Sequence, residues 1–207
     1  MTGPLVLACA ALASDLRAVL DTHGLAGAVE VRYLPAPLHN RPERIVPALR
    51  EQLADVARDR TVLIGYADCG TGGLLDDLLA ELEADFAAAG GAVSRIPGNH
   101  CYEFFAGSDR FAELHDAQPG TFYLTDFLAK HFDALVWQGL GLHEHPSLRD
   151  MYFGNYTRVV LLSQTDDPAV LAAGERAAEQ LGLAFEHVHV ARHQFASAVQ
   201  VGVRGRH

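Results

Sequence analysis

The sequence lacks the long apolar runs and the clusters of basic residues that mark membrane proteins and nucleic-acid-binding proteins. It contains no apolar run near the roughly 18 to 20 residues that a membrane-spanning helix needs. Its 207 residues carry a net charge of −10, and the basic side chains form no stripe. These absences exclude a membrane partner and argue against nucleic acid as a partner. No basic leader precedes the first predicted strand, so a cytoplasmic protein is expected.

Cysteine is also scarce. The chain has three cysteines, an odd number, which fits a reducing compartment better than a disulfide framework. No two of them form a C-x-x-C pair, so local spacing provides no metal-binding signature. The argument for a site depends instead on where the cysteines fall relative to the predicted strands.

Apolar residues are abundant, and their pattern is regular. The chain is 49% hydrophobic and 20% charged, which is enough to bury a large core. Strand and helix patterns alternate almost from end to end. The sequence therefore predicts an α/β protein with a mainly parallel sheet and helices on both faces, a Rossmann-like three-layer sandwich. We expect a single α/β domain over residues 1–207.

The predicted elements follow from apolar periodicity and from glycine and proline stops. The predicted strands are residues 5–8, 29–34, 62–64, the run ending at Pro97, 159–163 and 183–190. The predicted helices are residues 11–22, 45–58, 74 to the Gly90-Gly91 stop, 104–114 with an interruption at Gly107, 121–132, 147–153, 168–181 and a last one from about 194. Residues 134–137 fit a strand or a helix.

All three cysteines fall at the carboxyl ends of predicted strands. Cys9 closes the first strand, Cys69 lies in the loop after residues 62–64, and Cys101 follows the strand that ends at Pro97. If the strands are parallel, the sulfurs share one edge of the sheet, which is where open α/β folds bind ligands. Cys9, Cys69 and Cys101 are therefore predicted metal ligands, although buried cysteine is also a common small apolar filler.

The chemistry of sulfur narrows the choice of metal. Thiolates suit zinc and iron-sulfur clusters, and the sequence leaves these two open. Three protein ligands would leave one position on zinc, or on one iron of a cluster, free for a small-molecule ligand. His100 would be a fourth ligand or a neighbour of the metal, and His100 and Glu103 are the candidates for proton transfer.

A glycine-rich loop precedes the most regular predicted helix. Backbone N–H groups of such a turn favour an anion or a metal-bound ligand, although the loop lacks the Gly-Lys-Ser/Thr ending of a P-loop. The predicted cofactor-binding residues are Gly70, Thr71, Gly72 and Gly73. Because Cys69 lies beside this helix start, a metal-free enzyme that uses Cys69 or Cys101 as its nucleophile is an alternative.

Four motifs in order carry a resemblance to a known family. They are Y-A-D-C-G-T-G-G at 66–73, G-N-H-C-Y-E-F-F-A-G at 98–107, P-G-T-F-Y-L-T-D-F at 119–127 and F-G-N-Y at 153–156. Together they resemble the bacterial and archaeal proteins grouped as domain of unknown function 1638. The family commonly has A-C-G-A-L near its start, and A-C-A-A-L at residues 8–12 keeps the cysteine but replaces the glycine.

The resemblance implies no established activity. Some members are similar to accessory proteins found in the setting of corrinoid-dependent methyl transfer from methylated amines, which implies a methyltransferase as a partner. The leading hypothesis is a metal-binding protein, or a metalloenzyme, that acts on a small molecule. A non-enzymatic accessory or carrier protein for a metal, a corrinoid or a small anion is the alternative from another class, and a homo-oligomer stays open.

Overall fold

The computed structural model describes residues 3–190 and 192–204, and it confirms the α/β class. Every strand pair in these residues is parallel. The strands form a four-stranded sheet in the order β2-β1-β3-β4 and a three-stranded sheet in the order β5-β6-β7. The strands are β1 (Leu5–Cys9), β2 (Glu30–Leu34), β3 (Thr61–Gly65), β4 (Ala92–Arg95), β5 (Thr121–Thr125), β6 (Arg158–Ser163) and β7 (Ala184–His189).

The division into two sheets corrects the expectation of one. It corresponds to two compact units, residues 3–104 with 192–204 and residues 105–190. Between β4 and β5 the chain forms two successive helices, α4 (Cys101–Ala106) and α5 (Ser108–Ala117). Alternation of strands and helices predicts that neighbouring strands pair in parallel. It does not predict at which strand one sheet ends and the next begins. The expectation of a single domain over residues 1–207 stays a prediction.

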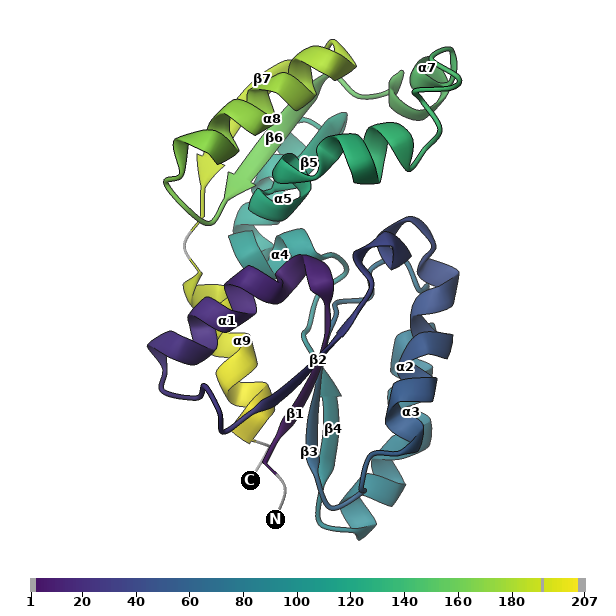
Figure 1. The fold of residues 1–207 in the computed structure, drawn as a ribbon, viewed down its shortest axis with the longest axis vertical. Coiled ribbons are helices and arrows are strands. Elements are labelled where there is room, and N and C mark those ends of the chain that lie inside the picture. Colours follow the sequence, from purple (N-terminus) through teal and green to yellow (C-terminus); the bar gives the residue numbers. More distant parts are fainter. Residues whose placement is uncertain (1–2, 191, 205–207) are drawn as a thin grey trace. The chain divides into compact units, whose positions relative to one another are not determined.

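The first unit has helices on both faces of its sheet. In Figure 1, α1 and α9 lie on one side of the strands, and α2 and α3 lie on the other. The α2–α3 side encloses a core of fully buried side chains that includes Leu7, Leu49, Ile64 and Phe86. The helices of this unit are α1 (Ala13–Thr22), α2 (Ile45–Ala54), α3 (Leu74–Ala88) and α9 (His193–Arg204), with 3₁₀ turns η1 (Ala10–Leu12), η2 (Ala36–Asn40) and η3 (Pro42–Arg44).

The second unit buries its own core. Leu124, Leu161 and Leu181 are completely buried there, between the sheet and helices α6 and α8. Helix α8 begins as its sequence predicts, because the Asp167 carboxylate accepts the N–H of Ala169 at 2.9 Å just before a proline. The remaining helical segments are α6 (Asp126–Lys130), η4 (Asp133–Gln138), α7 (Leu148–Phe153) and α8 (Pro168–Leu181).

The prediction of one helix over residues 121–132 is wrong. Residues Thr121–Thr125 form the strand β5, and only Asp126–Lys130 are helical. The apolar positions in this stretch fit both periods, and pairing of β5 with β6 decides between them. Residues 134–137, which fit either element, lie in the π-helical segment η4.

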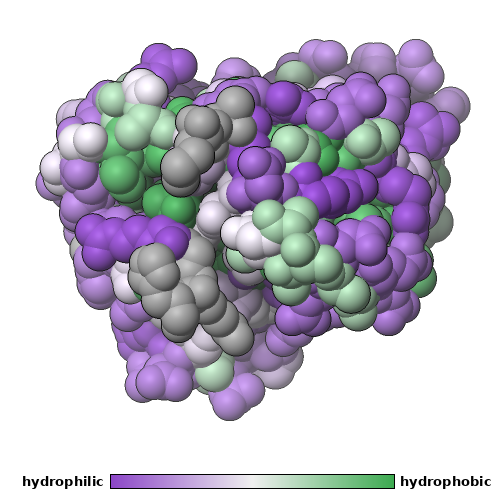
Figure 2. Space-filling view, turned by 90° about the horizontal axis from the view of Figure 1, so that it is seen from below, coloured by the Kyte–Doolittle hydropathy of each residue, from purple (hydrophilic) through white to green (hydrophobic). Residues whose placement is uncertain are grey.

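The surface seen in Figure 2 is mainly hydrophilic, with hydrophobic residues in small separate groups. Among the described helices, none combines the length and the apolar character that crossing a membrane requires.

Candidate metal centre

The first unit brings the three cysteines to the carboxyl edge of one sheet. Cys9 is the last residue of β1, Cys69 follows β3 by four residues, and Cys101 is the first residue of α4, after β4. Strands β1, β3 and β4 are consecutive neighbours in the sheet. Parallel pairing therefore places the ends of all three strands side by side, as the sequence pattern predicts.

The three thiols lie close enough together to raise one another's pKa values. Burial raises the pKa of the Cys69 thiol to about 11, and the Cys9 thiol adds to the shift. Burial also raises the pKa of Cys101 well above its ordinary value, and the thiols of Cys69 and Cys9 raise it further. Each cysteine residue keeps part of its surface exposed, so these shifts reflect desolvation of the sulfur atoms rather than complete enclosure of the residues. The pKa of each of the three thiols is thus raised above its ordinary value.

Protonated thiols are poor nucleophiles. A catalytic cysteine without a metal needs a lowered pKa, which a helix N-terminus or a nearby cation provides. Burial raises the pKa of Cys9 as well, although the backbone at Ala11 and the Tyr66 hydroxyl oppose the shift. A metal-free enzyme that uses Cys69 or Cys101 as its nucleophile stays a prediction, as does metal binding by the three thiols.

Cys69 itself has an unusual backbone conformation. Its φ is 52°, the only positive φ among the described residues other than glycine, and this region costs energy for a residue with a Cβ. The backbone is held there by the N–H of Cys69, which donates to the Asn99 carbonyl at 2.8 Å, and by the N–H of Asp68, which donates to the Gly98 carbonyl at 3.1 Å. These bonds fix the Cys69 loop against the segment that leads into Cys101.

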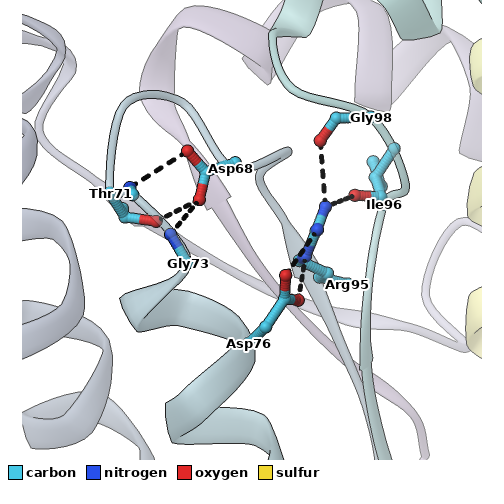
Figure 3. Close-up of polar contacts among 8 residues, drawn as sticks. Asp68, Thr71, Gly73, Asp76, Arg95, Ile96 and Gly98 are labelled. Atoms are coloured by element: carbon cyan, nitrogen blue, oxygen red, sulfur yellow. Dashed lines mark hydrogen bonds and ion pairs between the residues drawn. The ribbon is translucent and has the colours of Figure 1, made fainter.

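The Asp68 carboxylate holds the glycine-rich loop in place by accepting hydrogen bonds from its residues. The Asp68 carboxylate accepts the Thr71 hydroxyl at 2.7 Å and the N–H of Gly73 at 2.9 Å and of Gly72 at 3.1 Å (Figure 3). Partial burial opposes ionisation of Asp68, but these hydrogen bonds outweigh it and lower the pKa of the carboxyl. The N–H groups that suggested an external anion are therefore already occupied, and ligand binding by Gly70, Thr71, Gly72 and Gly73 stays a prediction.

Arg95 connects the segment that leads from β4 to Cys101 with helix α3. Its guanidinium pairs with the Asp76 carboxylate at 2.5 and 2.9 Å, and it donates to the carbonyls of Ile96 at 2.9 Å and Gly98 at 3.1 Å (Figure 3). A two-pronged pair of this kind holds a planar guanidinium in one orientation. The Gly98 carbonyl thus accepts from both Arg95 and Asp68, which links the two loops that carry Cys69 and Cys101.

Comparison with protein families identifies the chain. The family model described as Protein of unknown function (DUF1638) matches residues 33–199. The chain belongs to this family. The match contains Cys69 and Cys101, whereas Cys9 lies before it. No curated protein and no solved structure matches the chain.

In this DUF1638 protein, Glu103 has a structural partner. Its carboxylate accepts the N–H of Asn99 at 2.9 Å and lies 3.4 Å from Nδ1 of His100. The Glu103 side chain is largely buried, with 12% exposed, and that of His100 is 54% exposed. Glu103 therefore fixes the turn before α4, and proton transfer by His100 and Glu103 stays a prediction.

The spacing of the donors bears on which metal the site would hold. A tetrahedral zinc with bonds of about 2.3 Å needs its sulfur ligands about 3.8 Å apart. Within residues 3–190 and 192–204, no group of three or more His, Cys, Asp or Glu side chains is arranged to hold a metal ion.

The second unit of the DUF1638 chain contains a polar cluster to which the sequence assigned no role. The buried Ser163 hydroxyl contacts Nε2 of His187 at 2.8 Å and Nδ1 of His189 at 3.3 Å, and that same Nδ1 lies 3.3 Å from Asp166. The period of two along β7 already puts both histidines on one face. Because Ser163 and Asp166 contact the same nitrogen of His189, the groups do not form a Ser-His-Asp relay.

Asp126 connects the ends of β5 and β6 in the second unit. It is 7% exposed, and its carboxylate accepts the N–H of Gln164 at 2.9 Å and the Thr165 hydroxyl at 2.5 Å. Asp126→Ala should lower the free energy of unfolding by about 3 kcal/mol, because it removes charge-assisted bonds and leaves buried donors unsatisfied. Urea unfolding measures the change.

The neighbouring Asp166 is a matched control. Its side chain is 93% exposed, so Asp166→Ala should change the unfolding free energy by less than about 0.5 kcal/mol. Equal losses in the two variants would contradict the role given to Asp126.

Proposed function

We propose that this protein binds an iron-sulfur cluster through the thiolates of Cys9, Cys69 and Cys101. The observation that carries the proposal is the arrangement of all three cysteines of the chain, from three neighbouring strand ends, within electrostatic range of one another. Cysteines that only filled core space would have no reason to lie at the same edge of one sheet in all three cases. Thiolates are the ligands that such clusters prefer.

A cluster attaches its thiolates to different iron atoms, and three cysteines from one edge of a sheet are a donor set of the kind that it takes. Three ligands on a [4Fe–4S] cluster leave one iron open, and a small molecule that acts as substrate or ligand would bind there.

An accessory role is the second candidate. Glu103 is engaged by Asn99, and His100 is largely exposed, so neither is arranged as a free acid or base facing the thiols. This favours a protein that carries its cluster to a partner, such as a methyltransferase, over an acid-base enzyme. Mixing loaded protein with a colourless apo-acceptor should then transfer the brown colour; an acceptor that stays colourless would favour a resident site.

The test of the cluster is metal and acid-labile sulfide analysis of protein purified without oxygen. We expect a brown protein with about four irons and four sulfides per chain. One zinc per chain without sulfide would overturn the cluster and retain the thiolate site. Absence of metal after anaerobic reconstitution with iron and sulfide would overturn metal binding altogether.

A further inference from the structure

Two histidines and a buried serine meet at the carboxyl edge of the second sheet. Strand β6 ends at Ser163, and the neighbouring strand β7 ends at His189, with the two residues paired in register. His187 lies two residues earlier on β7 and contacts the same serine hydroxyl. The carboxyl edge of a parallel sheet is the usual place for ligands in α/β proteins. This cluster lies in the second unit, so its chemistry goes beyond the function proposed for the cysteines.

Hydrogen-bond chemistry assigns the protons of the cluster. A carboxylate can only accept, and Nδ1 of His189 lies 3.3 Å from Asp166, so Nδ1 carries a proton. Nδ1 is also 3.3 Å from the Ser163 hydroxyl, which therefore accepts from His189. The proton of that hydroxyl is then directed to Nε2 of His187 at 2.8 Å. In neutral His189, this pattern leaves the lone pair on Nε2.

The lone pair of His189 is better placed for chemistry than the hydroxyl of Ser163. Only 1% of the serine surface is exposed, whereas the His189 side chain is 47% exposed. The N–H of Gln164, which would stabilise an oxyanion formed on Ser163, donates to Asp126 instead. Ser163 is therefore suited to holding the ring of His189, and Nε2 of the exposed imidazole is the atom that can take up a proton.

The charges beside His189 restrict what can bind. The Asp166 side chain is 93% exposed, and that of Asp167, next in the chain, is 42% exposed. Lys130 pairs with Asp167 at 3.1 Å, so the net charge of these three groups is negative. Carboxylates repel phosphates and other anions. The favoured ligand is consequently a small uncharged molecule.

We propose that His189 is the general base of a second site, where Nε2 deprotonates a water molecule for attack on the carbonyl carbon of a small uncharged ester. The O–H bond of water breaks as the new C–O bond forms. The proton taken up by His189 then passes to the leaving alkoxide when its bond to the carbon breaks. The Asp166 carboxylate stabilises the imidazolium, and Ser163 holds the ring, so both are positioning residues. The proposal requires neither a metal nor a cluster.

The experiment measures hydrolysis of p-nitrophenyl acetate by wild type and His189→Gln. We expect the variant to have a kcat/KM lower by about a hundredfold, which is typical for loss of a general base. His143→Gln is the matched control, because the His143 side chain is 50% exposed, and it should hydrolyse the ester like wild type. A wild-type rate no higher than that of free imidazole at the same concentration, or equal rates in wild type and His189→Gln, would overturn the proposal.

A measurement on the unaltered protein covers a variant that fails to fold. NMR of the ring nitrogens should find the proton of neutral His189 on Nδ1; a proton on Nε2 would leave that atom unable to act as a base and would sink the proposal. Asp166→Asn should keep the fold, because the side chain is exposed, and should slow hydrolysis several-fold by removing the charge that stabilises the imidazolium. An unchanged rate would contradict the role of Asp166. Iron and sulfide analysis of the same preparation tests the proposed function separately, since neither result depends on a cluster.

Discussion

Cys69→Ser, Cys9→Ser and Cys101→Ser should each reduce bound iron and sulfide by more than about tenfold. Under the proposed function, each variant removes one of the three thiolates that would hold the cluster, and changes even to groups that only orient a ligand cost about 10-fold to 100-fold in affinity. Serine keeps the size of the side chain but is a far poorer ligand for iron. The measurement is iron and sulfide per chain after anaerobic reconstitution.

The control for the cysteine series is Met151→Leu. Met151 has a sulfur that is not a thiol and is 65% exposed, so this variant should load like wild type. Circular dichroism and thermal unfolding of each unloaded variant show whether the fold is retained. If one folded cysteine variant keeps full cluster content, that cysteine is core filler and the three-thiolate site fails. Cys9 is the most informative position, because it precedes the residues that match the family.

The stability of the loaded and unloaded proteins should depend on pH in opposite ways. In the unloaded protein, burial raises the pKa of Cys69 from 9.0 to about 11, so the folded state holds the proton more tightly than the unfolded chain. Its contribution to stability is present below pH 9 and is lost as pH rises through about 11. Cys9 and Cys101, whose pKa values burial also raises, act in the same direction.

Binding of a cluster should reverse the direction in which stability changes with pH. Bound cysteines have no proton, so the unfolded chain takes up protons below pH 9 and the loaded fold gains stability as pH rises toward that value. With three thiols to deprotonate, the loading equilibrium should strengthen by up to roughly a thousandfold per pH unit. Melting temperatures of both forms between pH 6 and 11, measured without oxygen, test this dependence.

The variant with alanine at all three cysteines separates the thiols from other titrating groups. It should lose less stability above pH 9 than wild type, because only the buried tyrosines with raised pKa values, such as Tyr66, still act in that direction, and it should gain nothing upon incubation with iron and sulfide. Parallel pH curves for wild type and this variant would contradict the assignment of the effect to the cysteines.

Several elements were predictable because a local pattern defines them. The helix over Leu74–Ala88 has an apolar stripe with a helical period and stops at two glycines, and Asp167 with Pro168 defines the start of the helix that ends at Leu181. Parallel pairing followed from the alternation of strands and helices. The edge location of the cysteines followed in turn, since Cys9 ends a strand and Cys69 and Cys101 follow one.

Local sequence patterns did not predict the hydrogen bonding of the glycine loop or of the Tyr66 hydroxyl. The sequence suggested that the glycine loop offers its N–H groups to a ligand, but the Asp68 carboxylate accepts them. The sequence does not show that Tyr66 is buried with a hydroxyl that makes no regular hydrogen bond within the described residues. Both features depend on where one polar atom points, and side-chain periodicity does not specify that.

The sequence by itself determined the α/β class, the parallel strands of each series and the three cysteines at strand ends, because these depend on periodicity and chain order alone. The tertiary structure decided that the strands divide into two sheets and that Thr121–Thr125 is a strand. It also decided that the three thiols are partly desolvated and near enough to raise one another's pKa values. These outcomes depend on which strands pair and how closely buried groups approach, and such long-range contacts override local preference wherever an apolar stretch fits two periods.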